Sequence, residues 1–251
     1  MPGTESSGHS LLFFCVIMML VMDNYGTLYV VATPIGNLED ITLRALRILK
    51  EVNYILCEDT RTTQKLLNKY EIKTKTISYH AHSTKDKESS IINLLKNGKN
   101  LALVSDAGTP GISDPGVLLV SNVKKFFREK VSVVPIPGPS ALVSALSASG
   151  ISSAEFVFLG FLPHKKGRET LFAEIANSKR VIVFYESVHR LLKTLASLKN
   201  YLTDEREIVV AREISKQFEE FISGNASYLY DYFNNQKEKQ RGEFVVIVSG
   251  R

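Results

Sequence analysis

The first half of the chain alternates short apolar runs with stretches whose apolar residues recur at helical spacing. Helices are predicted at 40–52, 60–70 and about 85–96, and an Asp can cap the first of them. The predicted strands are TLYVVAT (27–33), YILCEDT (54–60), TKTISYH (74–80), NLALVSD (100–106) and KVSVVPIP (130–137). Strands that alternate with helices of this length predict crossover units and a largely parallel sheet.

The pattern changes after PGPSALVSALSASG (137–150), where strands follow one another with fewer intervening helices. The strands predicted there are EFVFLGFLP (155–163), KRVIVFYES (179–187), EIVVARE (207–213), KQFEEFIS (216–223) and GEFVVIVSG (242–250). The sequence therefore predicts an α/β protein of two domains, with a boundary near residue 152. Residues 26–152 form the first domain, and residues 153–251 form a second domain with a mixed sheet.

Residues 1–25 are expected to form an extension outside both domains. Within it, LLFFCVIMMLVM (11–22) is too short for a transmembrane helix, which needs roughly 20 apolar residues. It also lacks the positive region and the small-residue cleavage site of a signal peptide. All four methionines fall at or before Met22. We therefore expect the functional protein to begin at Met22.

Composition narrows the class of protein. Of 251 residues, 44% are hydrophobic and 23% charged, which is typical of a soluble globular protein rather than a disordered one. Lys and Arg (31) exceed Asp and Glu (26), a balance that suits an anionic partner such as RNA. The two cysteines, Cys15 and Cys57, provide neither a disulfide framework nor a CxxC metal pair.

Polar and glycine-rich segments stand where the predicted strands end, the edge at which open parallel sheets bind ligands. These segments are TPIGN (33–37), CEDTR (57–61), SDAGTPGISDPG (105–116), PIPGPSA (135–141), FYES (184–187) and ARE (211–213). No GxG occurs, and Gly98-Lys99 has no glycine five positions upstream, so dinucleotide and P-loop motifs are absent. His80 and His82 form an HxH that nothing completes into a metal site, so a surface or hydrogen-bonded role is favoured for them.

The loop 105–116 is the strongest candidate binding segment. Its glycines permit close approach of a ligand to the backbone, and its prolines stiffen the path. A structural alternative is a long turn with a helix start at Asp114-Pro115, where Asp caps the helix. That alternative explains SDPG but leaves SDAGTPG without a role.

Eight motifs in order resemble the ribosomal RNA small subunit methyltransferase I family, which belongs to the tetrapyrrole-methylase-like group of S-adenosylmethionine enzymes. They are TPIGNLEDITLRAL, EDTR, ALVSDAGTPGISDPG, VVPIPGPSALVSALSASG, FLGFLPHKKGR, VIVFYESVHRLL, VVAREISK and RGEFVVIVSG. The resemblance covers nearly everything from Gly26 to Gly250. It implies methyl transfer from S-adenosyl-L-methionine to the ribose 2′-hydroxyl of a cytidine in the decoding centre of small-subunit (16S) ribosomal RNA. Enzymes of this family are cytoplasmic homodimers that need no metal and no membrane, with the cofactor between two α/β domains.

The resemblance also implies cofactor contacts at the matching positions. The methionine part is expected at the backbone of Asp106, Ala107 and Gly108, with Ile112 packing beside it. Ser140, Ala141 and Pro34 are expected to line the same cleft. The adenine is expected near Arg212 and Glu213 and the backbone around Gly242 and Glu243. A solvated strand end is the structural alternative for ARE.

Proton transfer and RNA binding require further residues. The CEDTR segment provides Glu58 as the leading base candidate and Arg61 to hold a phosphate or orient Glu58, while Lys216 and His82 stabilise developing negative charge. Asp59 or Thr60 could instead cap the next helix. Lys165, Lys166 and Arg168 follow GFLP, and we expect them to bind backbone phosphates; a solvated charge run is the alternative.

Two other functions remain open. A small-molecule, tetrapyrrole-like methylase would share the cofactor loops but is not expected to carry EDTR or HKKGR. A non-catalytic RNA-binding assembly protein is disfavoured by the intact cofactor motifs. Besides the N-terminal extension, the chain departs from the family pattern in two places. Ser83 stands where the family usually has Asn, and the chain stops at Arg251 without the family's short helical tail. These departures affect one polar contact and any RNA contact made by the tail.

Overall fold

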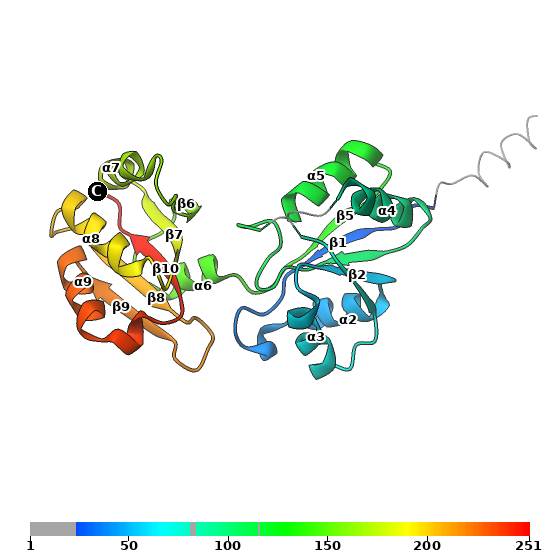
Figure 1. Ribbon diagram of the computed structural model, residues 1–251, viewed down its shortest axis with the longest axis horizontal. Coiled ribbons are helices and arrows are strands. Elements are labelled where there is room, and N and C mark those ends of the chain that lie inside the picture. The colour runs from blue at the N-terminus through cyan, green and yellow to red at the C-terminus, as the bar shows by residue number, and fades with distance from the viewer. Residues whose placement is uncertain (1–23, 81–83, 115) are drawn as a thin grey trace, which may run out of the picture.

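The computed structural model describes residues 24–80, 84–114 and 116–251, which form two α/β halves, each built on a five-stranded sheet (Figure 1). The expected N-terminal extension lies outside the described residues except for Asn24 and Tyr25, as do Met22, His82 and Ser83. No helix within the described ranges is long and apolar enough to cross a bilayer.

The first sheet has the order β3-β2-β4-β1-β5, and all its pairings are parallel, as predicted. Its strands are β1 (Leu28–Val31), β2 (Tyr54–Cys57), β3 (Lys75–Ser78), β4 (Leu101–Leu103) and β5 (Val133–Ile136). Its helices are η1 (Leu38–Asp40), α2 (Leu43–Glu51), α3 (Thr60–Lys69), α4 (Lys85–Lys96) and α5 (Gly116–Phe127). Because each crossover helix returns the chain to the same edge, all five carboxyl ends meet there.

Helices cover both faces of this sheet, which buries successive strand residues on opposite sides. Ile55 packs with α2 and α3, whereas Leu56 packs with α4 and α5. Figure 1 shows the sheet lying between these two helix pairs. Continuous burial on both faces explains why the strands read as unbroken apolar runs rather than as alternating ones.

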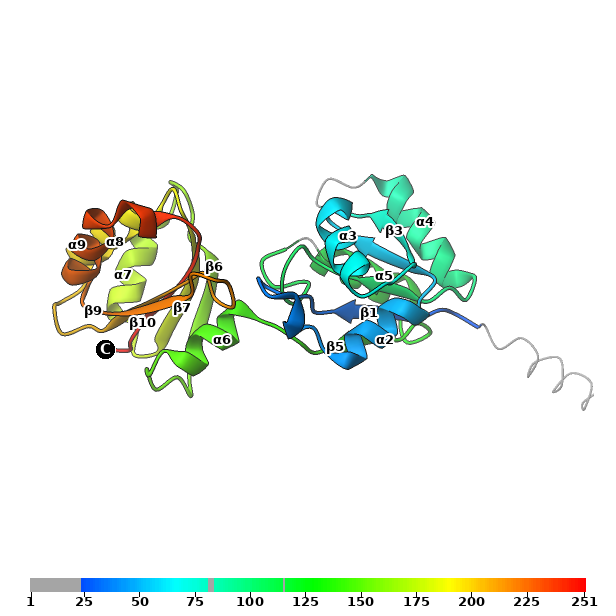
Figure 2. The same cartoon turned by 90° about the horizontal axis from the view of Figure 1, so that it is seen from below.

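The second sheet has the order β6-β7-β10-β8-β9 and is mixed, as predicted: β6 and β7 are parallel, and the other pairs are antiparallel. Its strands are β6 (Phe156–Phe161), β7 (Val181–Ser187), β8 (Ile208–Arg212), β9 (Glu220–Gly224) and β10 (Glu243–Val248). The helices α7 (Arg168–Asn177), α8 (Leu191–Tyr201) and α9 (Ala226–Asn235), followed by η2 (Lys237–Gln240), pack on one face (Figure 2). The strand predicted at 216–223 begins only at Glu220.

Helix α6 (Ala141–Ala148) packs on the other face of the second sheet. Ala145 and Leu146 are buried there against Val183, Val209 and Ile247. By packing, α6 thus belongs with the second half, although it precedes the boundary expected at residue 152. We propose that the division between domains lies in the 137–140 segment, because that segment joins the first sheet to the first helix that packs on the second.

Candidate active site

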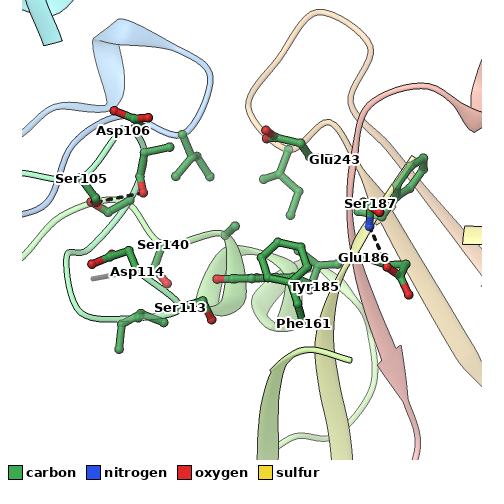
Figure 3. A pocket seen from close by; sticks show the side chains of 18 of the residues that line it. Ser105, Asp106, Ser113, Asp114, Ser140, Phe161, Tyr185, Glu186, Ser187 and Glu243 are labelled. Atoms are coloured by element: carbon green, nitrogen blue, oxygen red, sulfur yellow. Dashed lines mark hydrogen bonds between the residues drawn. The ribbon is translucent and has the colours of Figure 1, made fainter. Parts of the chain in front are cut away.

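A cavity of about 440 Å³ lies between the two halves, a size typical of small-molecule sites. On the first-domain side it is lined by the end of β2 and the β4–α5 loop, and on the second-domain side by the ends of β6, β7 and β10. Figure 3 shows Ser105, Asp106 and Asp114 on one side facing Phe161, Tyr185 and Glu243 on the other. Five of the six strand-end segments singled out in the sequence therefore contribute to one cavity, and ARE (211–213) is the exception.

The β4–α5 loop is fixed to the end of β1 by a short antiparallel bridge. The N–H of Thr33 donates to the carbonyl of Gly108, and the N–H of Gly108 donates to the carbonyl of Thr33, both at 2.9 Å. The Thr33 hydroxyl also donates to the carbonyl of Ser105 at 3.1 Å. Gly108 has φ +78°, a conformation that residues with a Cβ rarely adopt. The glycine thus lets the loop turn back onto the strand beside the cavity.

Asp114 closes the same loop. One of its carboxylate oxygens accepts from the N–H of Gly111 at 2.7 Å and from the N–H of Gly116 at 2.9 Å. Gly116 begins α5, so the carboxylate caps that helix as the sequence suggested. The capping interpretation does not exclude the binding interpretation, because Asp114 also lines the cavity.

Most of the expected cofactor residues come together. The cavity is lined by Asp106, Ala107, Gly108, Ile112, Ser140, Ala141 and Gly242. Pro34 lines a smaller hollow next to it, of about 200 Å³, together with Asp106 and Ala107. Ser140 precedes α6 as its N-cap residue but makes no side-chain capping bond, which leaves its hydroxyl available beside the cavity.

Arg212 and Glu213 are not among the residues that line the cavity, contrary to the sequence expectation. The Arg212 side chain is buried, and its guanidinium donates to the carbonyls of Arg241 (2.8 Å) and Phe218 (3.0 Å). A buried guanidinium needs such acceptors, so Arg212 is used to hold two loops together. Ile214, which follows this pair in the chain, lines the cavity instead, and so does Glu243, which was expected near the adenine. Phe244 and Val245 line it as well.

Glu58 follows β2 and lines the cavity as predicted. Burial raises the pKa of its carboxyl, and the neighbouring Asp106 and Asp114 raise it further, while His80 acts in the opposite direction. A raised pKa makes the carboxylate a better proton acceptor. The position and the electrostatics of Glu58 therefore agree with the role of a base.

Arg61 does not orient Glu58. Its guanidinium pairs with Asp59, with Nε 3.1 Å from Oδ1 and NH2 2.8 Å from Oδ2, and its side chain is 89% exposed. Asp59 also accepts from the N–H of Arg61 at 2.8 Å, which confirms the helix-cap interpretation for Asp59. The hydrogen bond from Arg61 lowers the pKa of Asp59 to about 2. Arg61 lies outside the cavity, where its exposed side chain is accessible to an external group such as a phosphate.

Lys216 reaches the cavity only through a carboxylate. Its Nζ lies 2.9 Å from Oε1 of Glu213 and 2.9 Å from Oε2 of Glu243, and Glu243 lines the cavity. Burial lowers the pKa of Lys216, but the hydrogen bonds with Glu243 and Glu213 outweigh it, and the net pKa is raised. Lys216 is therefore held as a cation that neutralises Glu243 and Glu213.

The predicted phosphate-binding set is divided by the structure. Lys165 and Lys166 are exposed in the loop after β6. Arg168 is buried at the start of α7, where it donates to the carbonyl of Pro163 (3.1 Å) and to the hydroxyl of Thr194 (2.7 Å). Arg168 thus links the loop that carries Lys165 and Lys166 to Thr194 of α8, and its guanidinium is not available to a phosphate.

Several lining residues had no role assigned from the sequence, chiefly Phe161, Tyr185, Glu186 and Ser187. The strand-end position of FYES was a signal for three of them. Burial raises the pKa of the Tyr185 phenol, although a hydrogen bond from the N–H of Leu142 opposes the shift. Within the described residues, no group of three or more His, Cys, Asp or Glu side chains could hold a metal ion.

Residues 27–229 match the family of Tetrapyrrole (Corrin/Porphyrin) Methylases. A Thermotoga maritima protein named ribosomal RNA small subunit methyltransferase I is 48% identical over 226 residues, which cover 90% of this chain and 99% of that protein. A Bacillus subtilis protein of the same name is 47% identical over 226 residues, covering 90% of this chain and 75% of that protein.

Solved structures share the fold at low sequence identity. A cobalt precorrin-4 methyltransferase has a TM-score of 0.66 at 16% identity, with 89% of this chain and 94% of that chain covered. A uroporphyrin-III C-methyltransferase from Thermus thermophilus, complexed with S-adenosylhomocysteine, has a TM-score of 0.60 at 18% identity, with 89% and 97% covered. Together with the fold and the strand-end cavity, these matches show that the chain belongs to the ribosomal RNA small subunit methyltransferase I family, within the tetrapyrrole methylases.

Proposed function

We propose that this chain transfers a methyl group from S-adenosylmethionine to the ribose 2′-hydroxyl of a cytidine in 16S ribosomal RNA. The observation that carries the proposal is the sign of charge in the cavity. Its charged lining residues are all acidic: Glu58, Asp106, Asp114, Glu186 and Glu243. Glu186 pairs with Arg190 and Glu243 pairs with Lys216, so the negative charge that faces a ligand comes from Glu58, Asp106 and Asp114 on the first-domain side. A cavity of this kind attracts a cationic small molecule and repels an RNA phosphate, so the RNA backbone must be held outside it.

The cavity residues fit S-adenosylmethionine. Its sulfonium and ammonium groups suit the acidic lining, and its apolar parts suit Ile35, Ile112 and Ile214. Among the described residues, no protein acceptor receives the backbone N–H groups of Asp106 and Ala107, which leaves both for a ligand. Ala141, the first residue of α6, also lines the cavity, and the N–H groups of that first turn suit a carboxylate.

When bound, the cofactor would supply an electrophilic methyl group. Glu58 would accept the proton of the attacking 2′-hydroxyl, since burial and then the carboxylates of Asp106 and Asp114 raise its pKa. Arg61, Lys165 and Lys166 are exposed outside the cavity and would hold phosphates that position the nucleotide. Alignment of hydroxyl and methyl carbon supplies much of the rate in such a reaction.

Methyl transfer to isolated small ribosomal subunits that lack the modification tests the proposal. We expect labelled methyl groups to enter 16S RNA at the 2′-oxygen of a single cytidine, which nuclease digestion and mass spectrometry would locate. Uroporphyrin-type substrates serve as the comparison. Labelling of these instead of RNA would favour the small-molecule methylase, and RNA binding without transfer would favour the assembly protein.

We also propose that the chain acts in the cytoplasm as a homodimer, as the family resemblance implies. Helix α5 exposes large apolar side chains that a second copy could cover, at Val117 (52%), Leu118 (56%) and Phe126 (61%). Sedimentation equilibrium should therefore give twice the chain mass of 28.0 kDa. A monomeric mass at micromolar concentration would contradict this part of the proposal.

Replacing Lys165 and Lys166 together by Ala should flatten the salt dependence of RNA binding. Each exposed cation that neutralises a phosphate contributes a slope of roughly 0.7 to 0.9 in log affinity against log salt, so the slope should fall by roughly 1.5. Arg168→Ala is the informative comparison, because its buried guanidinium holds the loop. That variant should lower the denaturation midpoint, whereas the double lysine variant should keep it. An unchanged slope in the double variant would make the loop a solvated charge run.

A further inference from the structure

Phe161 is the last residue of β6 and lines the second-domain side of the cavity. Its side chain is 54% exposed, which is unusual for a large aromatic residue at the end of a sheet strand. The edge of its ring is supported by Tyr185, with ring centroids 5.5 Å apart and an interplanar angle of 62°. Tyr185 packs in the same edge-on way against Phe158 at 4.9 Å. Tyr185, itself packed against Phe158, supports the Phe161 ring and leaves 54% of that residue exposed. Figure 3 shows Phe161 and Tyr185 on the second-domain side of the cavity.

A bulge in β6 directs Phe161 into the cavity. Strand alternation places Val157 and Leu159 on the helix-covered face, and Phe161 would follow them there. The register with β7 shifts between Phe158 and Phe161, and Gly160 has φ +62°. The shift moves Phe161 to the face of Tyr185, away from the core that would have buried it.

The residues that follow Phe161 indicate the kind of ligand. His164, Lys165 and Lys166 follow Phe161 within five residues and are exposed, so the chain continues from an open aromatic ring directly into a group of basic side chains. Proteins that hold single-stranded nucleic acid combine these two features, because bases stack on aromatic rings while cations hold the phosphates. The acidic cavity next to the ring excludes the phosphates themselves.

We propose that Phe161 is the stacking surface for the target base, a nucleobase subsite on the second-domain side of the cavity. A nucleotide whose ribose enters the cavity must leave its own stack, and Phe161 replaces the lost stacking. This inference rests on the proposed function. The competing ligand for the same surface is the adenine of the cofactor. If Phe161 stacks on the adenine, removing the ring should weaken cofactor binding. If it stacks on the target base, cofactor affinity should stay unchanged.

Phe161→Ala should raise the KM for small subunits by roughly 5- to 150-fold, the loss expected for one stacked base. The affinity for S-adenosylhomocysteine, measured by calorimetry, should stay unchanged, and Phe161→Tyr should restore the KM. Phe156→Ala is the matched control, because Phe156 is 40% exposed on the same strand and does not line the cavity. That control should behave as the parent protein.

The chain contains no tryptophan, so Phe161→Trp would introduce a single fluorescent reporter. Its emission should be quenched when small subunits bind in the presence of S-adenosylhomocysteine, and not by S-adenosylhomocysteine alone. The matched reporter Phe156→Trp should stay unquenched in both cases.

Four results would overturn the inference. Quenching of Phe161→Trp by S-adenosylhomocysteine alone, or a tenfold loss of its affinity in Phe161→Ala, would assign the ring to the adenine. An unchanged KM in Phe161→Ala, while the parent protein methylates small subunits, would remove the subsite and leave the proposed function standing. A parent protein that methylates no small subunit would overturn both.

Discussion

Glu58→Gln should retain cofactor and RNA affinity while single-turnover methyl transfer falls by about 10² to 10⁴, the contribution typical of a positioned general base. The amide keeps the shape of the side chain but cannot accept the proton of the 2′-hydroxyl. Rapid-quench measurement with saturating enzyme isolates this step from product release. Glu129→Gln is a suitable control, because Glu129 is exposed and does not line the cavity.

The pH dependence gives an independent check on Glu58. Burial and the carboxylates of Asp106 and Asp114 raise its pKa, so its base form is lost on acidification at a higher pH than for an ordinary glutamate. The parent protein should therefore show an acidic fall in single-turnover rate that is absent from Glu58→Gln. Near-parental rates in Glu58→Gln would remove Glu58 from proton transfer, and loss of cofactor affinity would make it a ligand contact.

Gly108→Val should reduce cofactor affinity by at least 100-fold while the protein stays folded. A Cβ at this position would meet its nearest neighbours at 3.5 Å and 3.8 Å, which are ordinary contact distances, so crowding within the protein is not the cause. The cause is φ +78°, which a β-branched residue resists at a cost of about 1 to 3 kcal/mol. Relaxing that strain would break the paired hydrogen bonds with Thr33 and move the loop into the ligand's space.

Gly150→Val is the matched control, because it introduces the same backbone strain at a position away from the cavity. Gly150 has φ +75°, nothing lies within 4 Å of a Cβ built there, and it does not line the cavity. Both variants should lose similar stability in urea denaturation, but only Gly108→Val should lose cofactor binding in calorimetry. Equal affinities in the two variants would contradict the role given to the 105–114 loop.

The sequence predicted the place of the candidate site more accurately than the side chains that line it. Asp106, Gly108 and Ser140 line the cavity as expected, because each follows a parallel strand whose end must lie at the binding edge. The predicted ligand contacts of Arg168 and Arg212 were wrong. The sequence does not distinguish an arginine whose guanidinium faces solvent from one whose guanidinium donates to buried carbonyls. Phe161 was missed, because period-two alternation does not reveal a bulge.

The parallel first sheet, the mixed second sheet and the family could be predicted from the sequence, because hydrophobic period and strand-end motifs are local properties of the chain. The tertiary structure decided what depends on contacts between distant segments. It placed α6 on the second sheet, paired Arg61 with Asp59 rather than Glu58, and brought Glu58, Asp106 and Asp114 together at one cavity. The charge of that cavity is a sum over residues far apart in the chain, and only folding brings them close enough to raise the pKa of Glu58.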